Sequence, residues 1–170
     1  MFSFNIEIWE LILYSIKRLL PAAVKAIAVF YSADEKTLHA KSILIENNNS
    51  VVELDISKCY SLINEVRTSK QNTWLNKSEI PFETDFGNEK NFSIFTETER
   101  NILTLSFYND ADKKYDILYI YLPSHNYLTG ISSSIKLLSQ ENKVIISQLV
   151  KNSINNIIEI ATTDSLAYNE

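Results

Sequence analysis

Histidine and cysteine, two residue types that often carry out enzymatic chemistry, are rare in this sequence. Its two histidines are His39, which lies in a stretch with the pattern of a strand, and His125, which follows Pro123. Neither has a neighbour at a spacing typical of a metal-ligand pair or of a base and its nucleophile. The single cysteine, Cys59, allows no intramolecular disulfide and no multi-cysteine metal site. The sequence therefore predicts a protein that is not an enzyme and that uses no metal ion and no cofactor.

Two acidic residues have the beginning of a calcium-binding motif without the rest of it. Asp110 and Asp112 have the spacing that opens a calcium loop, but the glycine and the closing glutamate of that loop are absent. We expect both carboxylates to lie on the solvated tip of a hairpin.

The candidate binding site is aromatic. Ser69–Asn91 is the least regular stretch of the chain, and it holds several aromatic residues among polar ones. A loop of this length in a compact domain is usually functional, and we interpret it as an ordered lid over a sheet. With tyrosines of the last strand it could line a mostly apolar pocket, although the same side chains could simply fill a core. The predicted ligand-binding residues are Trp74, Phe82, Phe86, Phe92, Tyr119 and Tyr121.

An antiparallel sheet would position these residues. Within Asn101–Leu122, two runs of β-branched and aromatic residues flank the polar tip Asn109–Lys114, which predicts a long hairpin. Further strands are predicted at Ala23–Tyr31, Leu38–Glu46, Val51–Leu54 and Phe92–Thr96. The sheet would therefore have about six strands.

Helices are predicted at both ends of the chain. Apolar residues recur at three- and four-residue steps over Asn5–Leu20, and Pro21 ends that helix. A second helix is predicted over Ser57–Thr68, and a long one begins after an N-cap at Ser139. We expect an α+β fold with the terminal helices on one face of the sheet and the lid on the other. The predicted single domain spans residues 1–170, with its terminal helices at 1–20 and 139–163.

Both terminal helices have apolar stripes wide enough to cover a sheet and to contact a second protein as well. Isologous dimers commonly pair such helices, so the sequence predicts a homodimer. The predicted interface residues are Ile12, Ile16, Val150 and Ile157.

Charge and hydropathy exclude two classes of partner. The net charge of −5 and the scattered Lys and Arg residues argue against a nucleic-acid-binding surface. The apolar start of the chain is interrupted by Glu7, Glu10, Lys17 and Arg18, so its runs are shorter than the ~20 residues of a membrane span. With no secretory signal at the start, we expect a cytoplasmic protein that does not bind membranes.

The order of elements resembles the GAF family of sensory domains. Those domains end in two long antiparallel strands, a loop and a final helix, which ILTLSFY, YDILYIYLP and LLSQENKVIISQLVKNSINNIIE match in pattern. AAVKAIAVFYSADEKTLHAKS is similar to the first hairpin of the family. The resemblance implies a bacterial signal-transduction or transcription-regulatory domain that binds a small molecule. PAS-like and profilin-like sensor folds are the alternatives.

The ligand motifs of known GAF subfamilies do not match this chain. Asn76, Lys77, Phe82 and Asp85 are similar to residues of cyclic-nucleotide-binding members, but they occur in the wrong part of the fold. Bilin-binding members use a pocket cysteine, whereas Cys59 has the pattern of a core residue. The family therefore implies a fold and a role without a named ligand.

The end of the chain has a second resemblance. ATTDSLAYN is similar to the linker that joins sensory domains to diguanylate cyclase domains, with the linker's Thr-Gly-Leu replaced by Ala167. This similarity implies an output domain after the last helix. The function predicted from sequence is a sensory domain that binds an unknown small molecule and relays through helix-mediated dimerisation. The alternative is a protein-interaction or dimerisation module with a degenerate pocket.

Overall fold

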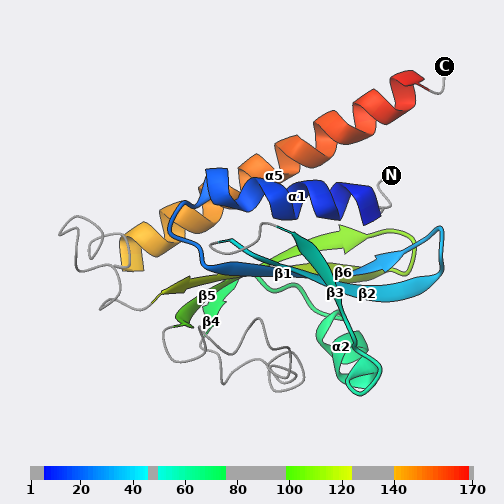
Figure 1. Ribbon diagram of the computed structural model, residues 1–170, viewed down its shortest axis with the longest axis horizontal. Helices are drawn as coiled ribbons and strands as arrows, with labels where there is room; N and C mark the ends of the chain where they lie inside the picture. The colour runs from blue at the N-terminus through cyan, green and yellow to red at the C-terminus, as the bar shows by residue number, and fades with distance from the viewer. Residues whose placement is uncertain (1–5, 46–49, 76–98, 124–139, 169–170) are drawn as a thin grey trace.

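The structure, a computed structural model, describes residues 6–45, 50–75, 99–123 and 140–168. These residues form an α+β fold with a six-stranded antiparallel sheet in the order β3-β2-β1-β6-β5-β4, which confirms the predicted fold class. The elements, numbered as in Figure 1, are α1 (Ile6–Leu19), β1 (Lys25–Ser32), β2 (Thr37–Leu44), β3 (Val51–Leu54), α2 (Tyr60–Val66), β4 (Thr73–Leu75), β5 (Glu99–Asn109), β6 (Lys114–Pro123) and α5 (Gln140–Tyr168).

The sheet is covered on both faces. Helices α1 and α5 lie side by side on one face, as predicted, and α2 lies on the opposite face (Figure 1). Side chains alternate between the two faces along each strand, so each face has its own apolar core. The core under α1 and α5 includes Trp9, which stacks on Phe30 with ring centroids 5.8 Å apart. The core under α2 includes Cys59 and Ile63.

The segment predicted as a lid begins as part of the sheet. Thr73–Leu75 form the edge strand β4 and pair with Ile102–Thr104 of β5, so the irregular lid over Ser69–Asn91 is corrected at these residues. A free edge of β5 offers backbone groups to any extended neighbour, and Trp74 favours a strand. The rest of the lid, the predicted strand Phe92–Thr96 and the predicted cap Ser139 lie outside the described residues.

The residues predicted to form a dimer interface belong to the core of a single chain. Ile12, Ile16 and Val150 are buried between the helices and the sheet, and Ile157 packs against the same cluster. Ile12, Ile16 and Val150 are therefore not available to a second chain and the predicted interface is corrected at them, while Ile157, which is partly buried, stays a prediction. Among the side chains that the structure describes in the two helices, the large apolar residues that are exposed are Leu11, Tyr14, Val144, Ile145, Leu149 and Ile160.

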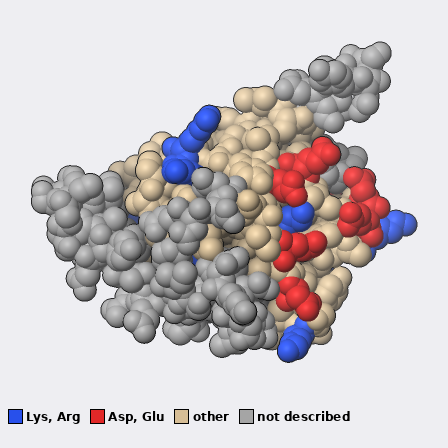
Figure 2. Space-filling model, in the orientation of Figure 1, with Lys and Arg blue, Asp and Glu red and all other residues tan. Residues whose placement is uncertain are grey.

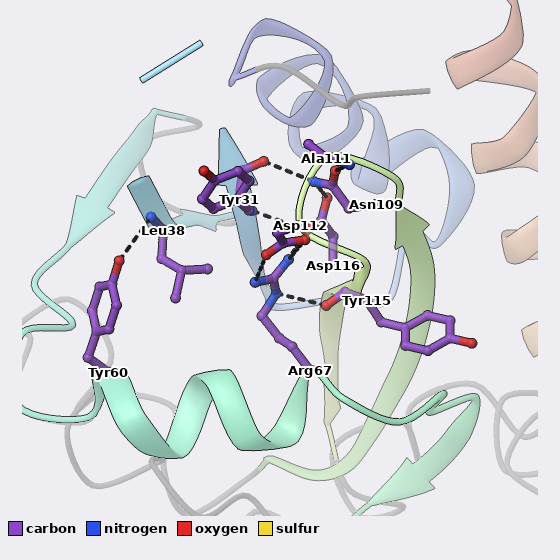
Figure 3. A network of polar contacts seen from close by, with 9 residues as sticks. All are labelled: Tyr31, Leu38, Tyr60, Arg67, Asn109, Ala111, Asp112, Tyr115 and Asp116. Atoms are coloured by element: carbon purple, nitrogen blue, oxygen red, sulfur yellow. Dashed lines mark hydrogen bonds and ion pairs between the residues drawn. The ribbon is translucent and has the colours of Figure 1, made fainter. Parts of the chain in front are cut away.

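A buried guanidinium joins α2 to the tip of the β5–β6 hairpin (Figure 3). Arg67, the residue that ends α2, is fully buried and donates to both carboxylate oxygens of Asp112, at 2.7 and 3.2 Å. It also donates to Asp116 at 2.8 Å and to the carbonyl of Tyr115 at 2.8 Å. Asp112 is therefore ion-paired and not a solvated carboxylate, which corrects the prediction made for the tip.

Asp116 is held from three directions within this network. Its carboxylate accepts the backbone N–H of Tyr31 at 3.1 Å and the side-chain amide of Asn109 at 3.0 Å, in addition to Arg67. Burial raises the pKa of Asp116 to about 7, against the opposing effect of the Arg67 charge and these hydrogen bonds. The network thus connects β1, α2 and both strands of the hairpin.

We predict that Arg67→Met lowers the free energy of unfolding by about 3–5 kcal/mol, because it leaves buried carboxylates without their cation. Urea denaturation followed by circular dichroism measures the change. Arg18→Met is the control, since Arg18 is exposed near the end of α1 and its loss should cost less than about 1 kcal/mol. Equal losses in the two variants would contradict a structural role for the buried guanidinium.

Candidate functional site

The predicted aromatic residues do not come together around one pocket. Trp74 pairs with Leu103 across the β4–β5 ladder and packs against the core under α1 and α5. Tyr119 and Tyr121 are buried in the core on the opposite face. A single pocket lined by Trp74 and both tyrosines is therefore wrong, because the pleat directs them to opposite faces of the sheet. The other three predicted residues, Phe82, Phe86 and Phe92, lie outside the described residues.

Trp74 instead attaches the edge of the sheet to α5. Its indole N–H donates to the carbonyl of Lys143 at 3.1 Å. The ammonium of the same lysine lies 5.4 Å from the centre of the indole ring, which is within range of a cation–π interaction. Trp74 therefore has a packing role at the start of α5.

Two adjoining hollows lie between α5 and the edge of the sheet, and we name them together the Lys151 groove. Their volumes are about 250 and 290 Å³, and Lys70 and Lys151 line both. The other described residues that line them are Asn72, Leu105, Ser147, Gln148 and Asn152 in the first hollow, and Ser106, Phe107, Tyr108, Tyr115 and Asn155 in the second.

Lys151 lines both hollows because its side chain reaches the edge of β5 and hydrogen-bonds a backbone carbonyl there. Strand β4 pairs with β5 only as far as Thr104, so beyond that point side chains bond the backbone of β5. Asn72 accepts the N–H of Ser106 at 3.1 Å, and the ammonium of Lys151 donates to the Ser106 carbonyl. The ammonium also donates to Asn72 at 3.0 Å and lies 4.6 Å from the ring centre of Phe107.

The electrostatics of the groove are cationic. Burial, and after it the positive charge of Lys70, lower the pKa of Lys151 to about 8. None of the described lining residues is an aspartate or a glutamate. Two of the three N–H groups of Lys151 are bonded to described residues, so the ammonium can donate once more.

A second polar cluster lies at the opposite edge of the sheet and contains His39. One ring nitrogen of His39 is 2.9 Å from Glu35, and the other is 2.5 Å from Glu53. Lys41 pairs with Glu10 nearby at 2.7 Å, and Figure 2 shows acidic side chains gathered on this side of the molecule. The glutamates are half-exposed and the cluster lines no described hollow, so it fits a set of surface ion pairs. No group of three His, Cys, Asp or Glu in the described part of the chain could hold a metal ion.

Sequence reasoning did not identify the residues of the groove. Ser106 is a polar residue in the middle of the apolar run ILTLSFY, and Lys151 lies beside the apolar stripe of α5. Each is a weak signal by itself, since polar residues at such places often only reach solvent. Their contact spans 45 residues of sequence, and nothing local in the sequence indicates it.

Comparison with known proteins identifies no relative. The chain matches no protein-family model, and no curated protein or solved structure matches it. None of the described helices is long and apolar enough to cross a membrane.

We predict that Lys70→Met raises the pKa of Lys151 by a fraction of a pH unit, because a nearby like charge disappears while the burial persists. The pKa is measured by following the ¹³Cε signal of Lys151 through a pH titration. Lys143→Met is the control, since Lys143 lies against Trp74 outside the described lining of the groove. A pKa of Lys151 near its ordinary value, or one that does not respond to Lys70→Met, would contradict the described geometry.

Proposed function

We propose that the chain is a cytoplasmic GAF-like sensory domain that binds a small molecule in the Lys151 groove and relays its binding through α5. One observation carries this proposal. The floor of the groove is the edge of the sheet, and one wall is the long C-terminal helix, whose own residue Lys151 lies between them. A ligand in the groove would therefore contact the sheet and the helix at once.

The attachment of α5 to the rest of the fold supports a relay. Its apolar contacts come from Val150, Ile154 and Ile158, which are buried beside α1, while its polar contacts to the sheet edge come from Lys143 and Lys151. One of these two polar contacts is inside the groove. A ligand that changes the hydrogen bonds of Lys151 would therefore change how α5 is held.

The order of elements supports a GAF-like role by resemblance. A six-stranded antiparallel sheet with the first and last helices on one face is what the resemblance implies, and α5 continues beyond the sheet (Figure 1). A protruding terminal helix suits the linker-like sequence at its end. The bacterial origin, the signalling role and the output domain are part of the proposal and rest on that resemblance.

A second candidate function is a homodimerisation module with no ligand. Ile145, Leu149 and Ile160 are each more than half exposed. Their spacings of four and eleven residues place them on one side of α5, which is the pattern of a helix that contacts a partner. Leu11 and Tyr14 of α1 are also exposed, at a three-residue spacing.

We predict that a screen of metabolites finds a ligand that stabilises the chain. At about 100 times its Kd, such a ligand adds about 2.7 kcal/mol to the free energy of unfolding. For a chain of this size, that corresponds to a rise in Tm of roughly 5–10 °C. Hydrogen exchange with the same ligand should slow in α5 around Lys151. A stabilising ligand that leaves exchange in α5 unchanged would contradict the relay, and the absence of any stabilising metabolite would favour the second function.

We predict that Leu149→Glu yields a folded monomer if α5 pairs two copies of the chain, because the charge lies on the outward side of the helix. Light scattering after size-exclusion chromatography measures the mass. Leu62→Glu, the same substitution at an exposed leucine of α2 on the opposite face of the sheet, is the control and should leave the mass unchanged. An unchanged dimer in Leu149→Glu would contradict pairing through this stripe.

A further inference from the structure

The charge of the Lys151 groove is opposite to that of the chain as a whole. The chain carries a net charge of −5, yet the described lining of the groove contains two lysines and no carboxylate. The ammonium group of Lys151 is partly removed from water, which is unfavourable for a charge unless a partner compensates it. Its two described hydrogen-bond acceptors, Asn72 and the Ser106 carbonyl, are neutral.

A pair of like charges at one site is stabilised by an anion between them. The charge of Lys70 contributes to the lowered pKa of Lys151, so the two ammonium groups repel each other in the unliganded groove. An anion in contact with both would reverse that repulsion and would bind with charge-assisted hydrogen bonds. The third N–H of Lys151 is the donor available for such a bond.

We propose that the Lys151 groove binds a small anionic metabolite whose carboxylate or phosphate group lies between Lys70 and Lys151. This inference rests on the site of the proposed function and names the class of its ligand. The remaining groups of the groove fit the body of such a molecule. Side-chain amides of Gln148, Asn152 and Asn155 can bond its polar groups, and the ring of Phe107 offers an apolar surface.

The size of the groove limits the ligand. Each hollow, of about 250 or 290 Å³, is smaller than the roughly 300–1,000 Å³ of small-molecule sites, and the two adjoining hollows together reach only the lower half of that range. A short organic acid or a small phosphate compound fits this space better than a dinucleotide. The acidic cluster around His39 lies at the other edge of the sheet and does not line the groove.

The test uses the full chain with succinate and inorganic phosphate as separate probes, and glycerol as a neutral probe. Binding is followed through the ¹³Cε signals of Lys70 and Lys151. We expect succinate or phosphate to shift both signals saturably at millimolar concentration and to raise the pKa of Lys151, while glycerol does neither. A response to only one of the two anions identifies the ligand group as carboxylate or phosphate.

The pH dependence of succinate binding has a definite sign. The ionisable groups that face Lys151 from the described elements are Lys70 and the phenols of Tyr108 and Tyr115. Succinate stays fully ionised above neutral pH, so loss of the Lys151 charge is the titration that matters. We expect the affinity to fall as the pH rises through about 8, the pKa of free Lys151.

Variants locate the bound anion. Lys151→Met should abolish binding, Lys151→Arg should retain it, and Lys70→Met should weaken it by about tenfold, the effect of about 1.4 kcal/mol. Lys70 is exposed, so its substitution keeps the test valid if Lys151→Met fails to fold. Lys143→Met is the matched control on α5 and should bind like the unmodified chain.

The outcomes separate this inference from the proposed function. If neither anion shifts the Lys151 signal, or if Lys70→Met and Lys151→Met bind as well as the unmodified chain, the inference is overturned. A neutral metabolite that stabilises the chain and shifts Lys151 also overturns it, but leaves the sensory role in place. Anion binding that does not alter hydrogen exchange in α5 supports the inference and contradicts the relay.

Discussion

The buried guanidinium of Arg67 is the interaction on which the arrangement of this fold depends. A single cation lies between the carboxylates of Asp112 and Asp116, with Arg67 and Asp116 fully buried and Asp112 mostly buried. Buried charges are tolerated only when their partners are placed with good geometry, so any slip of α2 against the hairpin would leave a carboxylate uncompensated. The raised pKa of Asp116 has the same cause, because one cation does not fully offset the burial of that carboxylate. The network therefore favours one register of α2, β1 and the hairpin tip over all others.

The fixed position of α2 against the hairpin also sets the starting point of the segment between α2 and β4. The N–H of Tyr115 donates to the carbonyl of Arg67 at 2.8 Å, and the guanidinium of Arg67 donates to the carbonyl of Tyr115, also at 2.8 Å. The chain leaves this fixed point and pairs with β5 from Thr73 onwards. The residues in between include Lys70 and Asn72, and Asn72 is held by its bonds to Ser106 and Lys151. The Arg67 network thus fixes one end of the short segment that carries two residues of the Lys151 groove.

Local periodicity predicted the elements well where neighbours in sequence decide the outcome. The hairpin, α1 and β3 follow from apolar patterns within a few residues, and the structure has β3 at Val51–Leu54 as predicted. The aromatic pocket required the relative facing of Trp74 and Tyr119, which depends on pairing between strands far apart in the chain. No local pattern contains that information.

The surface against which each apolar helix stripe packs could not be predicted either, because it also depends on residues far apart in the chain. An apolar stripe on a helix is compatible with a sheet or with a second chain, and the sequence of α1 does not distinguish them. Ile12 and Ile16 face the sheet, and the more exposed positions of the same helix are Leu11 and Tyr14. The contacts of Arg67 with Asp112 and of Lys151 with the Ser106 carbonyl each span 45 residues, so no local pattern indicated them.

The two candidate functions meet on one helix and are compatible with each other. In α5, a separation of two residues rotates a side chain by about 200°, so Lys151 points away from the side of the helix that carries Leu149. A ligand would therefore act on the inner side of α5 and a partner on its outer side. If a ligand shifted Lys151, the continuous helix between Lys151 and Ile160 would carry that shift to the exposed stripe. If two chains paired through that stripe, the pairing would also influence the position of α5. Through Lys151, it would then influence the charge of the groove.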